Sequence, residues 1–289
     1  MTATTPQQAR DATNQHYELP PELFALYLDQ RLKYSSGLYD AEHTDLDDAQ
    51  TNKLHFVARE LGLRGGERLL DIGCGWGSLL LFMAQEYDCR VTGVTPSGPQ
   101  ADFIRARAEE MGVSELVTLV PGAFTGVEVP GPFDAVTMLG SIVHMPDRTD
   151  VLRKVRGLLR RNGSLYVSES CFRDHETYRE FSRRPGTVHV TDSIFGFADM
   201  VPASVLVEAM EAAGFSLAGL TDLTAHYHRT IEQWEERVHA RRERVEEVAP
   251  GMSEPLVRYL QTANAGWGYT TKHYAFTAVK SRMGPTEVR

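Results

Sequence analysis

The feature that most limits what this chain can fold into is the run LLDIGCGWG at residues 69–77. An apolar segment of strand length ends in Asp71 and Ile72, three alternate glycines follow, and a helix-length apolar run starts at Ser78. Glycines adopt positive φ without steric cost and let the backbone approach a bound ligand. Ligands of open α/β sheets lie across the carboxyl ends of the strands, where such loops occur. The run therefore predicts a strand, a ligand-binding loop and a helix, in that order.

Segments of strand length and of helix length alternate along most of the chain. Strands are expected at 67–72, 90–94, 116–120, 133–139, 164–168, 215–223 and 269–279. Helices are expected at 21–30, 45–61, 78–87, 98–111, 148–160, 203–213, 230–248 and 253–263. Such alternation is typical of βαβ units with right-handed crossovers. The chain is therefore predicted to form a doubly wound α/β fold with a mainly parallel, seven-stranded, Rossmann-like sheet.

The domain organisation is expected to be simple. Residues 16–283 are predicted to form one domain, with a flexible tail at 1–15 and a short C-terminal tail at 284–289. Residues 16–44 and 170–202 are assigned to a cap or lid. The stretch 169–200 is rich in aromatic residues and histidines and shows little periodicity, and long irregular stretches in compact domains are usually lids or binding loops.

Charge and cysteine content exclude several classes of function. The net charge of −9 disfavours nucleic acids and anionic membrane surfaces as partners, because the long-range field repels them. No run approaches the roughly 18 apolar residues of a membrane span, so no stable membrane insertion is expected. Three cysteines cannot all pair, and their spacing matches no metal motif. Free thiols favour a reducing compartment, so the expected location is cytoplasmic, with a small-molecule substrate and a homo-oligomer as a weaker expectation.

The glycine loop resembles motif I of the class I S-adenosylmethionine-dependent methyltransferases. Its spacing Gly-x-Gly-x-Gly, from Gly73 to Gly77, differs from the dinucleotide motif Gly-x-Gly-x-x-Gly, and no P-loop lysine follows. The resemblance implies that the backbone of Gly73, Cys74 and Gly75 lines the methionine part of S-adenosyl-L-methionine. It also implies that Asp71 lies near the sulfonium and amino group.

A closer resemblance is to the cyclopropane fatty acid synthase group. It is carried by the segments HYELP at 16–20, KYSSG at 33–37, VTPS at 94–97 with Gln100, and HYHRTIEQW at 226–234. The resemblance implies that Tyr34 and Ser35 cover the cofactor and that Thr95 and Gln100 bind its ribose side. Ala123 and Phe124 stand where the family presents residues to adenine. Leu139 and His144 complete the cofactor-binding residues that we expect.

One departure from that group bears on the reaction. Cyclopropane synthases carry a Phe-Glu-His run after the fourth strand, and its glutamate holds the bicarbonate that removes the final proton. Here Val143 stands in place of that glutamate, and Ser168 stands in place of a family histidine. These two changes argue against the closure of a cyclopropane on a phospholipid, although a cyclopropane fatty acid synthase remains an alternative.

Methylation of a carbon–carbon double bond fits the remaining residues. Such a reaction passes through a carbocation, which aromatic π-faces stabilise and which must then lose a proton or cyclise. Glu169, just past the expected fifth strand, is the candidate base, with Tyr227 and His189 as further candidate catalytic residues. Tyr17, Phe172, Tyr178 and Phe195 are the candidate substrate-binding rings. The pattern is similar to that of bacterial natural-product enzymes of the teleocidin type, which C-methylate prenyl groups.

Two other functions stay open at this point. An O- or N-methyltransferase of a small metabolite could use His189 or Glu169 as its base. A cofactor-binding fold that serves only in assembly is a third interpretation, but an intact glycine loop disfavours it.

Overall fold

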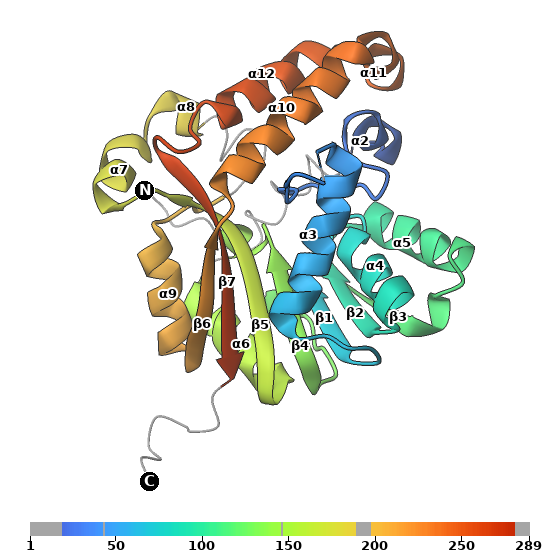
Figure 1. Cartoon of the computed structure of the whole chain (residues 1–289), viewed down its shortest axis with the longest axis vertical. Coiled ribbons are helices and arrows are strands. Elements are labelled where there is room, and N and C mark those ends of the chain that lie inside the picture. Colours follow the sequence, from blue (N-terminus) through green and yellow to red (C-terminus); the bar gives the residue numbers. More distant parts are fainter. Residues whose placement is uncertain (1–18, 43, 146, 189–197, 281–289) are drawn as a thin grey trace.

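The computed structural model describes residues 19–42, 44–145, 147–188 and 198–280, and within them a seven-stranded sheet (Figure 1). The strand order is β3-β2-β1-β4-β5-β7-β6, and β7 is antiparallel to both of its neighbours. The strands are β1 (Arg68–Ile72), β2 (Arg90–Thr95), β3 (Val117–Pro121), β4 (Phe133–Leu139), β5 (Leu159–Phe172), β6 (Phe215–Asp222) and β7 (Thr271–Lys280). The predicted doubly wound, mainly parallel fold is confirmed.

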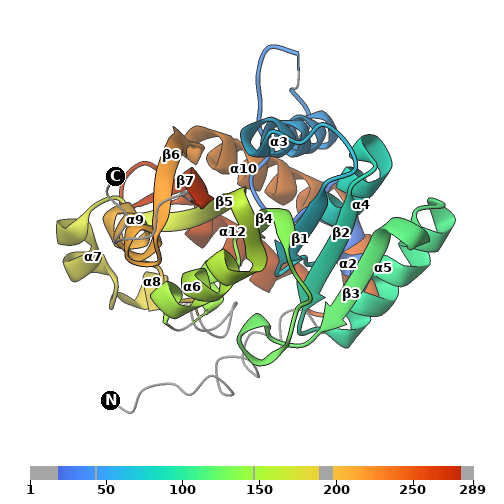
Figure 2. The ribbon, with the colours of Figure 1, turned by 90° about the horizontal axis from the view of Figure 1, so that it is seen from below.

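Two layers of helices cover the sheet, and Figure 2 shows α3 and α6 on opposite sides of it. On one face, α3 (Leu46–Leu61), α4 (Ser78–Tyr87) and α5 (Gly98–Glu110) bury a cluster that includes Leu54, Leu80 and Ile104. On the other face, α6 (Arg148–Leu158) packs on β5 and α9 (Ala203–Ala212) packs on β6, and the two helices join one apolar cluster that includes Leu152 and Met210. Because both faces are covered, the central parallel strands are apolar almost throughout.

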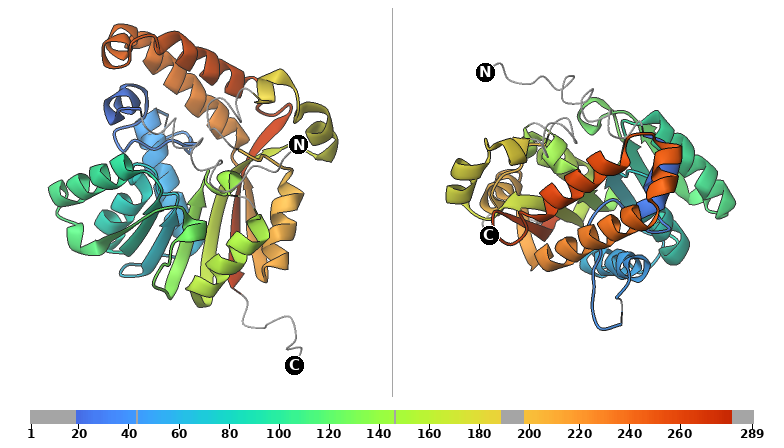
Figure 3. Two further views of the ribbon diagram at one scale, coloured as in Figure 1. Left: turned by 180° about the vertical axis from the view of Figure 1, so that it is seen from behind. Right: turned by 90° about the horizontal axis from the view of Figure 1, so that it is seen from above.

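A third group of helices lies beyond the carboxyl ends of the parallel strands (Figures 1 and 3). It comprises α2 (Pro21–Tyr27), α10 (Thr224–Ala240), α11 (Arg242–Val248) and α12 (Ser253–Asn264). The apolar faces of α2, α10 and α12 meet in a separate cluster that contains Phe24, Trp234 and Leu260, with Trp76 from the glycine loop. The cap over the sheet edge therefore includes the helices from 224 to 264 in addition to the N-terminal segment.

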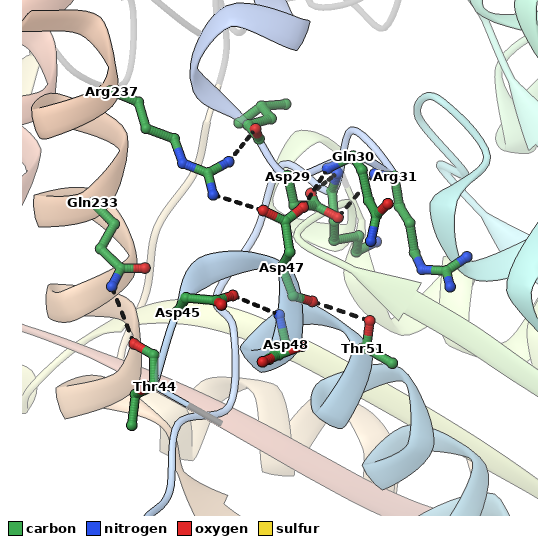
Figure 4. A network of polar contacts seen from close by, with 12 residues as sticks. Asp29, Gln30, Arg31, Thr44, Asp45, Asp47, Asp48, Thr51, Gln233 and Arg237 are labelled. Carbon is green, nitrogen blue, oxygen red and sulfur yellow. Dashed lines mark hydrogen bonds and ion pairs between the residues drawn. The ribbon is translucent and has the colours of Figure 1, made fainter. Parts of the chain in front are cut away.

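Polar contacts fix the N-terminal segment between α3 and α10 (Figure 4). Arg237 of α10 donates to Asp47 Oδ2 at 2.7 Å and to the carbonyl oxygen of Leu28 at 2.7 Å. The other carboxylate oxygen of Asp47 accepts from the backbone N–H of Gln30 at 2.7 Å. Asp45 caps α3 by accepting from the N–H of Asp48, as expected of an acidic N-cap residue. The segment that precedes Tyr34 is thus held from two sides.

The sequence expectations for the end of the fifth strand and for the long helix at 230–248 are wrong. The fifth strand was expected to end at Ser168, but β5 runs to Phe172 because β7 pairs with it as far as Thr271. Glu169 therefore lies within the strand, and not in a loop after it. The single helix expected at 230–248 is two helices, since Arg241 leaves the helical conformation at φ −118° and ψ 24° and α11 turns to pack Val245 against Leu23.

The stretch expected to be irregular, 169–200, contains two short helices within its described part. These are α7 (His175–Phe181) and α8 (Pro185–Val188). None of the helices in the described ranges is long and apolar enough to cross a membrane.

Candidate active site

A first cavity of about 170 Å³ opens at the carboxyl ends of β1, β2 and β4, above the glycine loop. Ten of the residues expected to bind the cofactor line it: Tyr34, Gly73, Cys74, Gly75, Thr95, Gln100, Ala123, Phe124, Leu139 and His144. Ser35, Asp71 and Gly77 do not line this cavity. The ten residues come from five separate segments of the chain, and the fold brings them together at the sheet edge where open α/β sheets bind ligands.

The three loop glycines differ in what a side chain at each position would meet. All three have positive φ, at +74° for Gly73, +56° for Gly75 and +81° for Gly77. A Cβ atom at Gly73 would lie 2.5 Å from the Cβ of Ser141, and one at Gly77 would lie 2.7 Å from Ile104. A Cβ atom at Gly75 would meet no protein atom within 4 Å. Gly73 and Gly77 are therefore needed for packing, whereas the missing side chain of Gly75 leaves open space on the cavity side.

Thr95 and Gln100 form a buried pair at the end of β2. The Thr95 hydroxyl donates to Gln100 Oε1 at 2.7 Å. With its oxygen engaged, the Gln100 side chain offers its amide nitrogen as a donor to the cavity. An amide donor suits a ribose hydroxyl, as a carboxylate acceptor would in other members of this fold class.

Asp71 lies behind the loop in a buried cluster of charges. Thr137 donates to its carboxylate at 2.8 Å, and burial raises the pKa of Asp71 although nearby Lys33 acts in the opposite direction. Lys33 and Lys53 are buried as well, together with Asp29. Two potential cations thus stand against two carboxyl groups, so the cluster can be neutral overall, which limits the cost of its burial.

Lys53 connects this cluster to the segment over the cofactor cavity. Lys53 is only 2% exposed. Its amine donates to Ser35 Oγ at 2.8 Å. Gln50 Nε2 donates to the carbonyl oxygen of Ser35 at 2.6 Å. Burial lowers the pKa of Lys53 well below its usual value. Both contacts hold the Tyr34–Ser35 pair at the cavity wall.

Replacing Lys53 by methionine is expected to weaken S-adenosylhomocysteine binding about tenfold. The substitution removes the hydrogen bond from the Lys53 amine to Ser35, which holds the Tyr34–Ser35 pair in place. Calorimetric titration measures this affinity. Lys280→Met is the control, since that lysine donates to the Leu159 carbonyl at the opposite end of the sheet. Wild-type affinity in a folded Lys53→Met protein would contradict the positioning role.

A second, larger cavity of about 570 Å³ adjoins the first, and Tyr34, Gly140 and His144 line both. This volume lies within the range of small-molecule sites. Its described walls combine aromatic and aliphatic side chains with a few polar groups. The apolar wall includes Val143, Phe181, Met200, Tyr227, Ile231, Tyr259, Ala263, Trp267 and Tyr269. A methyl group transferred from a cofactor in the first cavity to an acceptor in the second would pass beside these three shared residues.

Glu169 lines the second cavity and is 4% exposed. Its Oε2 accepts from the backbone N–H of Val143 at 3.2 Å, and its Oε1 accepts from the N–H of Ser170 at 2.9 Å. Burial raises the pKa of Glu169 to about 7, although both hydrogen bonds act to lower it. A carboxyl group with such a pKa can exchange a proton near neutral pH.

Of the other expected catalytic and substrate residues, the structure brings only Tyr227 to this cavity among those it describes. Phe172 and Tyr178 do not line it: their rings pack on each other at 5.4 Å, and Phe172 is buried. The extension of β5 explains this, since it places Phe172 inside the sheet. Tyr17, His189 and Phe195 lie outside the described residues.

Four aromatic lining residues near the C-terminus were missed by the sequence reasoning: Tyr259, Trp267, Tyr269 and His273. Trp267 stacks on Tyr227 at 4.8 Å, and His273 meets Tyr227 edge to face at 4.7 Å. The available signal was the last strand. A strand antiparallel to β5 must begin at the carboxyl edge of the sheet, so the residues before and at its start lie near the site.

The comparisons with known proteins agree with this arrangement. The family model described as mycolic acid cyclopropane synthetase matches residues 4–274. The chain belongs to that family. Its members are S-adenosylmethionine-dependent methyltransferases related to the cyclopropane fatty acid synthases, so the resemblance seen in the sequence is confirmed. The residues of the first cavity fit this cofactor, because loop backbone, a buried amide and an aromatic ring face a space at the expected sheet edge.

The relatives of this family member differ in their acceptors. A probable fatty acid methyltransferase of Pseudomonas putida is 28% identical over 261 residues, which cover 90% of this chain and 65% of that protein. The chain thus spans less than two thirds of that relative. The cyclopropane synthase MmaA2 of Mycobacterium tuberculosis superimposes with a TM-score of 0.86 at 23% identity, over 94% of this chain and 98% of the other. The geranyl diphosphate C-methyltransferase of Streptomyces coelicolor A3(2), solved with S-adenosyl-L-homocysteine, gives 0.70 at 17%, over 96% and 99%.

Proposed function

We propose that this family member transfers the methyl group of S-adenosyl-L-methionine to an alkene carbon of a small isoprenoid acceptor, and that Glu169 removes the proton that is then lost. The observation that carries the proposal is a single buried glutamate in a large, mainly apolar and aromatic cavity that adjoins the cofactor cavity. The prenyl acceptor of the Streptomyces coelicolor protein, which shares the fold, makes the isoprenoid class the first to test.

The position of the Glu169 carboxyl supports the role of base. Its Oε2 accepts a hydrogen bond from the N–H of Val143, the residue that stands where cyclopropane synthases carry the glutamate that holds bicarbonate. The Glu169 carboxyl group of β5 thus lies beside Val143, the position after β4 at which cyclopropane synthases carry a glutamate. In this chain the side chain itself can take the proton that bicarbonate takes in the cyclopropane synthases.

Each step of the proposed reaction has a counterpart in the cavity. The bound cofactor supplies an electrophilic methyl group; the alkene π electrons form the new C–C bond as the C–S bond breaks. The acceptor carbon next to the new bond becomes cationic, and the rings of Tyr227 and Trp267 are among the π-faces available to it. Glu169 then accepts a proton from a neighbouring carbon, and the C–H electrons restore a double bond. Capture of the cation by a second alkene before proton loss would give a ring.

N-methylation of an amine is the second candidate. The aromatic wall favours it as well, because Tyr227, Trp267 and Tyr259 would attract an ammonium product as they attract a carbocation. An amine also requires a base, and Glu169 could serve it.

The two candidates are separated by the atom that carries the new methyl group. The enzyme is incubated with S-adenosylmethionine that carries ¹³C in its methyl group, and with geraniol, geranyl diphosphate or a secondary amine as acceptor. We expect a carbon-bound methyl signal from a prenyl acceptor. A label that appears only on nitrogen or oxygen would overturn the proposal.

The rate of product formation should rise with pH between 6 and 8. Glu169 must be ionised to accept a proton, and its pKa of about 7 leaves it protonated at the lower end. Below pH 7 the rate should fall by up to about tenfold per pH unit, as expected for a single required base. A pH-rate profile with S-adenosylmethionine saturating is the measurement, and a rate that is flat over this range would argue against Glu169.

Activity should not depend on bicarbonate. Glu169 supplies within the chain the carboxyl group that bicarbonate supplies elsewhere in the family, so no external base is required. The rate is compared in degassed buffer with and without added bicarbonate. A clear rise on addition would return cyclopropane formation to first place.

A further inference from the structure

The second cavity contains a polar pair that the proposed reaction does not use. Ser170 of β5 and His273 of β7 are opposite each other in the antiparallel pairing, and Ser170 Oγ lies 3.2 Å from His273 Nδ1. Both residues line the cavity, and His273 is only 2% exposed. A polar side chain as well buried as that of His273 is normally satisfied by hydrogen bonds.

Only one side of the imidazole is satisfied by the protein. Nδ1 meets Ser170, whereas Nε2 has no hydrogen-bond partner in the part of the chain that the structure describes. The ring is held in place by Tyr227 at 4.7 Å and Trp267 at 6.2 Å, both edge to face. The backbone N–H of His273 donates to Thr224 Oγ1 at 3.1 Å, which fixes the residue further. These contacts with Ser170, Tyr227, Trp267 and Thr224 fix the orientation of the ring and leave Nε2 available to a ligand.

The charges around the pair favour a neutral ligand group. Burial, with help from Lys53, lowers the pKa of His273 to about 3, so the ring is uncharged at physiological pH. The amine of Lys53 is engaged with Ser35 and does not line the cavity. Glu169, which precedes Ser170, ionises near neutral pH and would repel an anion. An uncharged imidazole and a hydroxyl together offer one donor and one acceptor, in either tautomer.

We propose that Ser170 and His273 form a specificity subsite that binds a neutral oxygen-bearing group of the acceptor, a hydroxyl or a carbonyl, through His273 Nε2. The inference rests on the proposed function, because it assigns a second functional group to the alkene acceptor. It predicts an acceptor that is an oxygenated isoprenoid rather than a plain hydrocarbon or a chain with an anionic group at this end.

Binding of three matched probes to the full chain loaded with S-adenosylhomocysteine tests the subsite without turnover. The probes are geraniol, the hydrocarbon 2,6-dimethylocta-2,6-diene, which lacks only the hydroxyl, and geranyl phosphate. We expect wild-type protein to bind geraniol about tenfold more tightly than the hydrocarbon, the scale of one net hydrogen bond to a buried partner. The affinity for geranyl phosphate should not depend on His273.

Three variants separate the subsite from a general effect on the fold. His273→Phe should remove the preference for geraniol and keep hydrocarbon binding, and His273→Gln, which retains a donor and an acceptor, should restore part of it. His55→Phe is the control, because His55 contacts the Tyr87 hydroxyl at 2.9 Å on the far side of α3 and should keep the wild-type ratio.

Equal binding of geraniol and the hydrocarbon by wild-type protein, or no binding of either, would overturn the proposal. So would an unchanged preference in a folded His273→Phe protein, or a geranyl phosphate affinity that depends on His273. Because the readout is binding, it is independent of the atom that receives the methyl group. A label found on nitrogen or oxygen with an intact geraniol preference would refute the proposed function and leave the subsite standing.

Discussion

Replacing Gly75 by valine is expected to lower the affinity for S-adenosylmethionine by about a hundredfold or more, equivalent to about 2.7 kcal/mol. The new side chain would stand in the open space that the missing side chain leaves on the cavity side, where it meets no protein atom. A β-branched residue also resists the φ of +56° at this position. Calorimetric titration with S-adenosylmethionine and with S-adenosylhomocysteine measures the loss.

Gly62→Val provides a matched control for backbone strain. Gly62 ends α3 with a φ of +66°, and a Cβ atom there would also meet nothing within 4 Å, but the residue lies away from both cavities. Both variants should lose similar thermal stability, and only Gly75→Val should lose the cofactor. Equal affinity for S-adenosylmethionine in the two folded variants would contradict the assignment of the glycine loop to cofactor binding.

Glu169→Gln is expected to slow product formation by about 10²–10⁴-fold, the usual contribution of a general base. The amide keeps the shape and can accept one of the two hydrogen bonds that Val143 and Ser170 donate to the carboxylate, but it cannot accept the proton. Cofactor affinity should be unchanged, because Glu169 does not line the first cavity. Where the methyl group is still transferred, the cation should end as other alkene isomers, water adducts or cyclic products.

Product analysis by mass spectrometry and NMR, with a prenyl acceptor that the wild-type enzyme methylates, follows both rate and product distribution. Glu60→Gln is the control: this glutamate accepts from the Thr277 hydroxyl at 2.7 Å and lines neither cavity. Wild-type rate and products in Glu169→Gln would remove Glu169 from the mechanism. A slower rate with a single product methylated on nitrogen or oxygen would favour the second candidate.

The cofactor side of the molecule was readable from the sequence because its signals are local. The glycine loop, the strand before it and the helix after it are adjacent in the chain, and the helix at 78–87 has the bounds that were expected. Thr95 and Gln100 are five residues apart across one strand–helix turn, so their meeting follows from the βαβ pattern alone.

The acceptor side was harder because it depends on contacts between distant segments. Glu169 was expected in a loop, and only pairing with β7 shows that it lies in a strand and packs against Val143. The aromatic wall was expected from the irregular stretch 169–200 with Tyr17 and Tyr227. Within the described residues Phe181 and Tyr227 do line the cavity, but Tyr259, Trp267 and Tyr269 come from the end of the chain. Phe172 and Tyr178 illustrate the reverse case, in which aromatic rings serve packing rather than a cavity.

The fate of the proton shows whether the methyl group is transferred to an alkene carbon with loss of a C–H proton. Geraniol or geranyl diphosphate carrying deuterium on every carbon is methylated by the wild-type enzyme, and the product mass is recorded. The account predicts a product with a new carbon-bound methyl group and one deuterium fewer than the acceptor, formed more slowly than from unlabelled acceptor if proton loss limits the rate. A methylated product that retains all its deuterium and carries the methyl group on oxygen would contradict it.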